Sequence, residues 1–348
     1  MPIPQKPTFC PLCHSHQIIR KGTRQNRFRR IPLYFCKACY KYFSAAIITK
    51  VKYPPRLIMQ AITYYNLGHS QTQVSKLLAQ NHRTRVPRRT ISEWIKKYAS
   101  VCTYARLRNQ AKRLYPPTEL IQSHDLHHRQ VYTFQLHRAK LKLLQDNLSP
   151  RAFARLRAYL EFIATDQFPH HLFQDKDDPS GPEAKNPNRS SQIKLETLPF
   201  IKTEKQNLAN DLATLGLIMA RTNHQRHPAI QEFMLINDST TLACEVPVYL
   251  TSENIRYFQD QGFHLTLSEK DAPITGHIDI LQIRNNLIHI LDYKPDAHKV
   301  QPISQLLTYA LALATHTKLP LKTFKCAWFD EKSYFEFFHL HAVYPASH

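Results

Sequence analysis

Two short apolar strands that both end in a carboxylate give the strongest constraint on how this chain folds. In residues 276–309, Asp279 lies among isoleucines, and a turn at 285–286 leads into the apolar run 287–291 and then into Asp292-Tyr293-Lys294. Alternation along a strand places Asp292 and Lys294 on the same face. Burying an acid and an ammonium beside a sheet core is costly unless they pair with each other or hold a metal ion.

Paired carboxylates with a nearby lysine suit a hard divalent cation that polarises a phosphodiester and generates hydroxide. After Pro302 we expect a helix from about residue 303, and Gln305 and Tyr309 share one face of it because they are four residues apart. A structural salt bridge between Asp292 and Lys294 is the competing interpretation. Three elements in order at close spacing favour the metal site.

This constellation resembles the PD-(D/E)xK nuclease superfamily in its RecB-type branch, whose signature is GxxD on one strand, (D/E)xK on the next and QxxxY on the following helix. The corresponding positions here are residues 276–279, 292–294 and 305–309. The resemblance implies a nuclease core in which Asp279 and Asp292 bind Mg²⁺ or Mn²⁺. It also implies that Lys294 orients the attacking water, while Gln305 and Tyr309 hold the lysine or a backbone phosphate.

The resemblance implies one further metal ligand on a helix before the strands. His227 is the preferred match, Glu232 the second choice, and Glu245, within an expected strand at 241–250, the third. For Glu245, a strand-end charge paired with Lys or Arg is an equal interpretation. Several RecB-type enzymes carry an iron–sulfur cluster on four cysteines, but only Cys244 and Cys326 lie in this half, so we expect none.

Positive charge is concentrated in the first third of the chain. The 348 residues carry a formal charge of +21, and residues 1–115 hold 23 Lys or Arg against one acid, Glu93. A basic body of this kind suits a polyanion such as DNA. A membrane surface is the alternative, but no segment has ~18 consecutive apolar residues and no signal peptide opens the chain. We therefore expect a cytoplasmic, nucleoid-associated protein that binds DNA and no membrane.

Seven cysteines divide into two CxxC pairs and three single residues. Cys10 with Cys13 and Cys36 with Cys39 are separated by 22 residues, close to the spacing of four-cysteine zinc sites, which favours metal over disulfides. Zn²⁺ there would be structural, because four thiolates leave no open coordination position. The hairpin between the pairs is too small to build its own core and would take folding energy from the metal.

Residues 53–99 show helical periodicity in three short segments, which indicates a helix-turn-helix unit. Capping boxes of Ser70 with Gln73 and of Thr90 with Glu93 mark the second and third segments. The third is expected to read the major groove of DNA, through Arg88, Arg89, Ser92, Lys96 and Lys97.

A zinc ribbon followed by such a unit resembles the N-terminal half of insertion-sequence transposases, over about residues 8–100. The resemblance implies DNA binding, but not transposase chemistry, because no convincing DDE triad is present. A ribbon that binds RNA or another protein is the alternative, and the positive charge and the helix order weigh against it.

Residues 101–172 are predicted to form amphipathic helices that act as a spacer or a dimerising segment, and residues 174–192 a polar linker. The histidines of this region lack a matching acidic partner set, so we interpret them as solvated surface residues rather than metal ligands. They are His124, His127, His128, His170 and His171. A helix over about residues 203–221 is expected to open the last segment.

The expected architecture is an α+β multidomain chain. Its parts are a zinc ribbon at 1–50, a helix-turn-helix at 51–115, a helical spacer and linker at 116–193, and a mixed α/β nuclease core at 194–348. The expected function is metal-dependent DNA cleavage targeted by the N-terminal module, in the context of mobile elements, defence or repair. A transcription regulator with an inactive nuclease fold and an RNA-processing nuclease are the alternatives. DNA is the expected partner; a homodimer and protein partners stay open.

Overall fold

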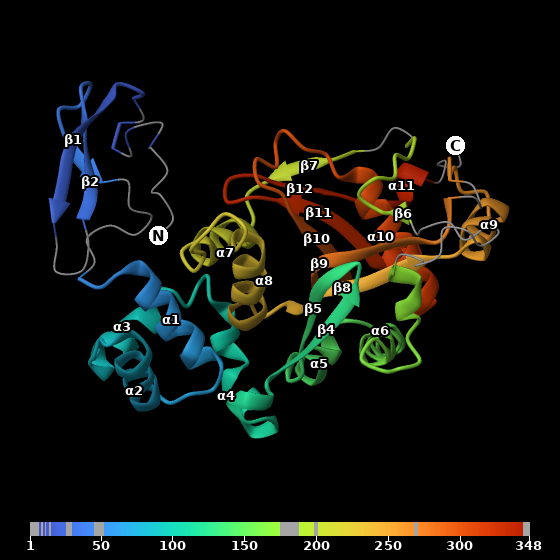
Figure 1. Ribbon diagram of the computed structural model, residues 1–348, viewed down its shortest axis with the longest axis horizontal. Helices are drawn as coiled ribbons and strands as arrows, with labels where there is room; N and C mark the ends of the chain where they lie inside the picture. The colour runs from blue at the N-terminus through green and yellow to red at the C-terminus, as the bar shows by residue number, and fades with distance from the viewer. Residues whose placement is uncertain are drawn as a thin grey trace.

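The N-terminal sheet is small, antiparallel and built around the CxxC pairs. In this computed structural model, which describes residues 7, 10, 12–13, 15–25, 30–44, 52–174, 188–197, 201–267 and 271–343, its strands are β1 (Ile18–Gln25), β2 (Arg30–Cys36) and β3 (Tyr42–Ser44). The sheet lies at the left in Figure 1, and its buried cluster consists of Cys10, Tyr34, Cys36 and Phe43. So small an apolar cluster contributes little stability by itself.

Three helices follow the N-terminal sheet and pack on one another: α1 (Pro55–Asn66), α2 (Gln71–His82) and α3 (Arg88–Lys97). We call them the three-helix unit. The capping box predicted at Ser70 is confirmed, because the side chains of Ser70 and Gln73 each accept a hydrogen bond from the other residue's backbone N–H. The box predicted at Thr90 is wrong. α3 begins directly after Pro87, whose extended backbone and missing N–H suit the position before a helix, so Thr90 lies inside it.

The three-helix unit shares a core with the C-terminal part of the chain. One continuous apolar cluster holds residues of all three helices together with Ile280 and Leu291 of the large sheet. Asn66 of α1 donates a hydrogen bond to Asn237 at 2.9 Å, and Asn237 donates one to Thr63 at 3.2 Å. Buried amides bonded in this way fix the position of α1 relative to α8, whose last residue is Asn237.

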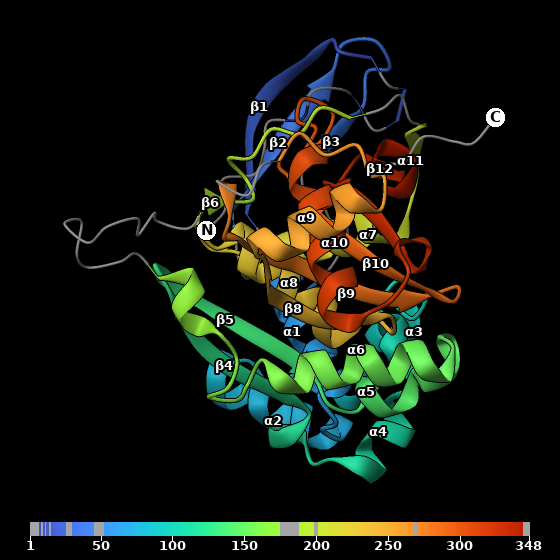
Figure 2. The ribbon, with the colours of Figure 1, turned by 90° about the vertical axis from the view of Figure 1, so that its right-hand side faces the viewer.

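A nine-stranded mixed sheet forms the C-terminal part of the molecule (Figures 1 and 2). Its order is β4-β5-β8-β9-β10-β11-β12-β7, and β6 pairs with β9 off this path. β10 with β11 and β6 with β9 are parallel pairs. The strands are β4 (Ile121–His128), β5 (Gln130–His137), β6 (Asn188–Arg189), β7 (Thr203–Lys205), β8 (Thr241–Leu250), β9 (Ile274–Arg284), β10 (Leu287–Tyr293), β11 (Phe324–Phe329) and β12 (Tyr334–Phe337).

Helices cover both faces of this sheet, so the mixed α/β architecture predicted from the sequence is confirmed. α10 (Ile303–Thr317) packs on one face in an apolar cluster that also contains α6 (Pro150–Phe162). α7 (Leu208–Leu217) and α8 (Arg226–Asn237) belong to the cluster shared with the three-helix unit. The shorter helices are α4 (Arg108–Leu114), α5 (Lys140–Leu143), α9 (Ser252–Asp260) and α11 (Leu340–Val343). Among the described residues, no helix is long and apolar enough to cross a membrane.

The prediction of helix is wrong for residues 121–137, which form the β4–β5 hairpin seen at the edge of the sheet in Figure 2. Gln135 and Leu136 of this hairpin pair with Cys244 and Ala243 of β8. The partner strand lies more than 100 residues away in the chain, so local periodicity could not reveal it. The helix expected from residue 203 also begins later, at Leu208, because 203–205 pair with β12 as β7.

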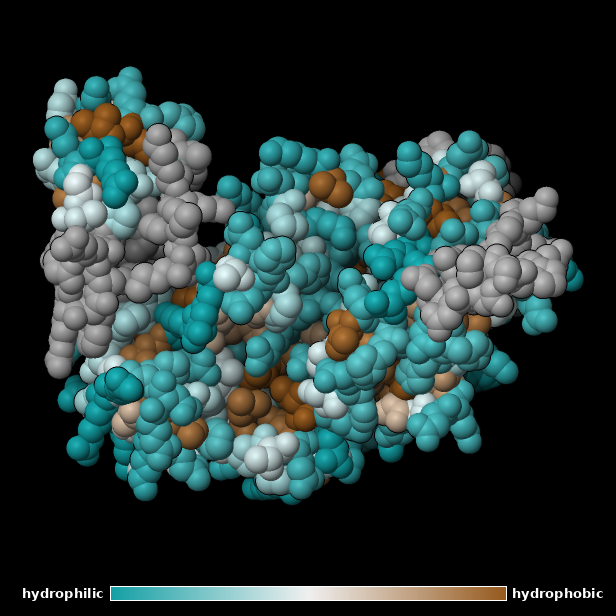
Figure 3. Space-filling view, in the orientation of Figure 1, coloured by the Kyte–Doolittle hydropathy of each residue, from teal (hydrophilic) through white to brown (hydrophobic). Residues whose placement is uncertain are grey.

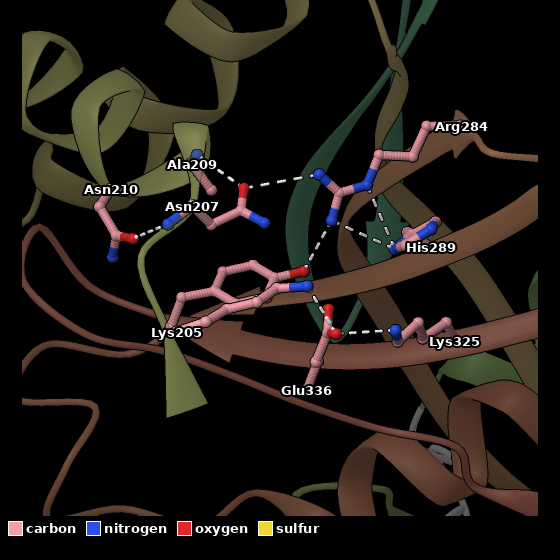
Figure 4. Close-up of polar contacts among 9 residues, drawn as sticks. Lys205, Asn207, Ala209, Asn210, Arg284, His289, Lys325 and Glu336 are labelled. Carbon is pink, nitrogen blue, oxygen red and sulfur yellow. Dashed lines mark hydrogen bonds and ion pairs between the residues drawn. The ribbon is translucent and has the colours of Figure 1, made fainter. Parts of the chain in front are cut away.

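A polar network holds β7 to the sheet, as Figure 4 shows. Glu336 of β12 lies between Lys205 of β7 and Lys325 of β11, with contacts of 2.6 Å and 2.7 Å. Burial would raise the pKa of Glu336, but the two lysines outweigh it and lower that pKa. Arg284 donates a hydrogen bond to the hydroxyl of Tyr334 in the same network, at 2.9 Å. The short strand β7 is therefore held to β12 by the ion pair of Lys205 with Glu336 as well as by backbone hydrogen bonds.

Lys140 joins α5 to the two elements that lead into the centre of the sheet. Its side chain is fully buried, and Nζ donates to the carbonyl oxygens of Leu235 in α8 and Thr241 in β8 at 2.6 Å and 2.7 Å. Burial lowers the pKa of this lysine to about 7, although Asp238 acts in the opposite direction. The amine therefore serves as a hydrogen-bond donor that stabilises the turn between α8 and β8.

We predict that Lys140→Met lowers the free energy of unfolding by about 2–4 kcal/mol at neutral pH, because it leaves two buried carbonyls without a donor. The wild-type free energy of unfolding should also rise between about pH 7 and pH 10.5, where the unfolded lysine still holds a proton that the folded one has lost. Lys140→Met should lack the part of this rise that comes from Lys140. Denaturant titrations at pH 7 and pH 9 measure both effects, and the exposed Lys142→Met is the control. Equal pH dependence in all three proteins would contradict the assignment.

Candidate active site and metal sites

Asp279 of β9 and Asp292 of β10 come together where β10 ends. Ile280 pairs with Leu291 in the antiparallel ladder of β9 and β10. Asp279 and Asp292 are the next residues along the two strands, so they lie side by side. Their residues are 8% and 1% exposed. The backbone N–H of Tyr293 donates to Asp279 Oδ2 at 3.0 Å. Two carboxylates thus meet in an environment from which water is largely excluded.

Lys294 supplies the positive charge next to Asp292. Its Nζ lies 2.9 Å from Asp292 Oδ2, whereas Oδ1 of the same carboxylate has no hydrogen-bond partner among the described residues. Burial raises the pKa of Asp292, Asp279 raises it further, and the ion pair with Lys294 does not offset them. Burial would lower the pKa of Lys294, but Asp292 and Asp279 raise it, so the ammonium stays charged.

His227, at the start of α8, completes a group of three possible metal ligands. Its Nε2 lies 2.6 Å from Asp279 Oδ2, and ligand atoms of His227, Asp279 and Asp292 all fall within 4.8 Å of one another. Burial would lower the pKa of His227, but Asp279 and the other nearby acids raise it to about 9. The proton on this ring must leave before its nitrogen can bind a cation.

The two glutamates considered beside His227 lie in different places. Glu245 sits in β8 at φ +52°, and its carboxylate accepts a hydrogen bond from Gln231 of α8 at 2.7 Å. Burial and the charge of Asp279 raise the pKa of Glu245 to about 7, so Glu245 borders the acid pair. Glu232 instead lines a cavity between α8 and α1. The structure therefore places His227 beside the two aspartates and Glu232 away from them.

Gln305 and Tyr309 of α10 lie beside the same group and contact each other, with Gln305 Nε2 donating to the Tyr309 hydroxyl at 2.7 Å. Gly276 is required here for space, because an added Cβ would lie 2.5 Å from Tyr309 Cε1 and closer still to Ser190 Oγ. Ser190 is buried and its N–H donates to Thr275. The sequence interpretation placed Ser190 in a linker. Residues 188–190 pack beside Gly276 instead, because β6 pairs with β9.

These residues lie in a segment of the chain that matches a known protein family. Residues 183–336 match the PD-(D/E)XK nuclease superfamily. The nuclease segment so defined contains both aspartates, Lys294, His227 and the α10 pair. No curated protein and no solved structure gave a match.

The donor set of the nuclease segment fits a hard divalent cation. Two carboxylates and an imidazole converge, and the buried Oδ1 of Asp292 lacks a hydrogen-bond donor among the described residues, which is costly unless something else neutralises it. The nuclease superfamily generally uses Mg²⁺ or Mn²⁺.

The four cysteines of the CxxC pairs also converge. The Sγ atoms of Cys10 and Cys39 are 3.7 Å apart and those of Cys13 and Cys36 3.5 Å apart, and all four lie within 4.8 Å of one another. Four sulfur ligands in such a cluster could bind Zn²⁺. The other three cysteines, Cys102, Cys244 and Cys326, are free thiols buried in the apolar clusters of the molecule.

One predicted surface histidine is buried. His128 is 2% exposed, stacks on Phe173, and bonds through its two ring nitrogens to His277 (2.8 Å) and His170 (2.9 Å). Alternation along β4 points it inward, whereas His127 is exposed as predicted. Because each ring nitrogen of His128 already has an imidazole partner, the three rings do not converge on a common point as metal ligands do.

The residues predicted to contact DNA lie on the outer side of α3. Arg88, Arg89, Lys96 and Lys97 are exposed and Ser92 is half-buried, whereas Ile91 and Trp94 point into the shared core. Arg89 pairs with Glu93 at 3.2 Å, with both side chains largely exposed. The helix therefore presents a basic face to solvent.

Proposed function

We propose that this chain is a metal-dependent deoxyribonuclease whose N-terminal third holds the DNA on which the nuclease segment acts. The observation that carries the proposal is the convergence of Asp279, Asp292 and His227 inside the segment that matches the nuclease superfamily. A buried salt bridge alone would need one acid for Lys294, not two acids whose charges repel each other.

In this proposal Asp279, Asp292 and His227 hold Mg²⁺ or Mn²⁺, and the main-chain carbonyl of Tyr293 and the carboxylate of Glu245 border the site. When bound, the cation supplies the charge that polarises the phosphodiester and makes a water molecule acidic. Lys294, held by Asp292, orients that water and opposes the negative charge that develops on the phosphate. Tyr309 and Gln305 position the substrate phosphate beside the lysine.

The four cysteines would bind one Zn²⁺ and stabilise the N-terminal sheet. Together with the basic face of α3, this region would supply most of the phosphate contacts, because residues 1–115 carry nearly all of the excess positive charge. A role in mobile elements, defence or repair is compatible with a nuclease targeted in this way.

Cleavage of three substrates by the full-length protein tests the function. Duplex DNA, single-stranded DNA and RNA of the same sequence are incubated at one salt concentration with Mg²⁺, Mn²⁺ or EDTA. We expect metal-dependent cutting of DNA. Cutting of RNA alone would support the RNA-processing alternative, and tight DNA binding without cutting of any substrate would support a regulator with an inactive nuclease fold.

We predict that Arg89→Ala weakens DNA binding by about 1–3 kcal/mol if this arginine grips a guanine, and by a smaller, sequence-independent amount if it contacts a phosphate. Fluorescence anisotropy on several duplexes distinguishes the two results. Arg157→Ala is a matched control, because Arg157 also pairs with a glutamate one turn further along its helix, Glu161, on the solvent-facing side of α6. Equal loss of affinity in both variants would exclude α3 as the contact surface.

A further inference from the structure

A cavity of about 380 Å³ lies where the three-helix unit meets the nuclease segment. Its walls come from α1, from the connection between α7 and α8, and from α8 itself. Arg56 and Thr63 line it on the first side, Met219 and Arg221 on the second, and Glu232 and Phe233 on the third. Apolar side chains such as Met219, Phe233 and Ile236 also line it, so the cavity combines apolar and charged walls. The surface over the three-helix unit, at the lower left in Figure 3, is mostly hydrophilic.

The positive groups at this cavity lack acidic partners. Among the described residues, neither Arg56 nor Arg221 forms an ion pair, although other arginines on the surface, such as Arg138, do. Burial and the charge of Arg221 lower the pKa of Arg56, so the two guanidinium groups are close enough to repel each other. Placing two uncompensated cations together costs free energy unless an anion joins them.

A third basic group belongs to the same part of the three-helix unit. His82, at the end of α2, has a buried Nε2 with no hydrogen-bond partner among the described residues. Burial lowers the pKa of His82, and the charges of Arg56 and Arg221 lower it further, although His82 itself does not line the cavity. A ring nitrogen that is neither solvated nor bonded is an exception in folded proteins and calls for an explanation.

The cavity is held rigidly and lies close to the acid pair along the chain. Pro228 and Ala229 of α8 line it, and they follow His227 directly. The hydrogen bonds between Asn66, Asn237 and Thr63 fix α1 against α8, and Thr63 also lines the cavity. One helix therefore presents the metal ligand on its sheet-facing side and the cavity wall on the side that faces α1.

We propose that this cavity binds one backbone phosphate of the nucleic acid, some distance from the bond that is cut. Guanidinium groups are donors that a phosphodiester accepts well, and the two in this cavity come from both parts of the molecule: Arg56 from the three-helix unit and Arg221 from the nuclease segment. The cavity would then fix the substrate strand relative to the three-helix unit and to the nuclease segment at once. Glu232 stands on the opposite wall and would weaken the binding of any anion. The proposal rests on the proposed function, because it takes the substrate to be a nucleic acid.

The test uses the full-length chain with Arg56→Gln, Arg221→Gln and both together. Dissociation constants for duplex DNA are measured at two salt concentrations with Asp292→Asn also present, so that no substrate is consumed. Each single change should raise Kd about tenfold, which is the size of one lost charge-assisted contact. The slope of log K against log salt concentration changes by roughly 0.9 for each phosphate that is no longer neutralised. If both arginines hold the same phosphate, the slope of the double variant should therefore be shallower by roughly 0.9 and not by twice that amount.

Glu232→Gln and Arg157→Gln complete the set. Removing the carboxylate should lower Kd, because an anion in the cavity no longer meets a like charge. If instead Glu232 serves as counterion to the arginines in solution, Glu232→Gln should lower the melting temperature and leave Kd unchanged, which would overturn the proposal. Arg157→Gln, on α6 and away from the cavity, should change neither quantity.

Cleavage kinetics separate this proposal from the proposed function. With Asp292 restored, the arginine variants should raise KM and leave kcat nearly unchanged, since the contact is the same in the ground and transition states. Normal KM and Kd in a chain that cuts DNA would overturn the cavity assignment alone. Raised Kd in the arginine variants of a chain that cuts no substrate would support the cavity and contradict the nuclease function.

Discussion

Asp292→Asn is expected to abolish phosphodiester cleavage and, in the absence of divalent metal, to make the protein more stable. The amide cannot neutralise a cation, so the proposed metal site would lose one of its two charged ligands, and cleavage should fall by on the order of 10²-fold or more. Lys294→Ala should cost a similar factor, because it removes the group that, in the proposed function, opposes charge on the phosphate.

The gain in stability follows from the charges that meet at this point. Burial and the nearby charge of Asp279 raise the pKa of Asp292. An acid whose folded pKa lies above its unfolded pKa stabilises the fold below the unfolded value, and that contribution is lost as the pH rises through the folded value. At neutral pH and without metal, the carboxyl group of Asp292 therefore destabilises the folded state, and Asn at this position removes that destabilisation.

Metal titration tests both statements on the same protein. Mn²⁺ or Mg²⁺ should raise the melting temperature of the wild type, because a ligand that binds only the folded state stabilises it, and should do so much less for Asp292→Asn. Asp296→Asn is the matched control, since Asp296 lies four residues on and pairs with Lys299 at the exposed surface. Cleavage within tenfold of wild type, or a melting temperature below it, would contradict the site.

That Asp279 and Asp292 converge was predictable, because the two residues are close in sequence and their strands follow strand periodicity. A turn at 285–286 sets β9 against β10, so Asp279 and Asp292 meet once the two strands pair. Which residue of α8 joins them depends on the helical period. At about 100° per residue, Glu232 lies roughly 140° around the helix from His227, so only one of them faces the sheet.

The elements that escaped prediction depend on distant partners. The β4–β5 hairpin pairs with β8 across more than 100 residues, and its exposed outer positions hide the alternation that marks a strand. Ser190 follows a polar, proline-bearing segment, and only the pairing of β6 with β9 brings it beside Gly276. The local pattern of apolar and polar residues predicts such segments poorly, because tertiary contacts decide which of their residues are buried.

The shared core also bears on how the parts of the chain can be separated. A fragment that starts near residue 194 would lack β4, β5 and α6, and would expose the faces of α8 and β9 that pack on the three-helix unit. The contributions of targeting and chemistry are therefore better measured by substitutions in the full chain than by truncation.

Cys36→Ser is expected to remove zinc from the chain and to unfold the N-terminal sheet while the rest keeps its structure. Burial would raise the pKa of Cys36, but the backbone N–H groups of Cys39 and Ala38 outweigh it and lower that pKa to about 6. Cys36 is thus the thiol prepared to act as a thiolate ligand, and a hydroxyl in its place binds zinc poorly.

The size of the effect follows from how little else holds this sheet. Its buried cluster consists of Cys10, Tyr34, Cys36 and Phe43, whereas zinc binding to four-ligand sites of comparable small domains contributes roughly 10–16 kcal/mol. Elemental analysis should find one zinc per wild-type chain and none in Cys36→Ser, whose residues 15–44 should become sensitive to protease. DNA affinity should fall, and kcat at saturating DNA should stay close to wild type. Cys102→Ala, at a buried thiol outside the cluster, should keep its zinc. One full equivalent of zinc in Cys36→Ser would mean that this sulfur is no ligand, since three cysteines cannot complete the four-thiolate shell.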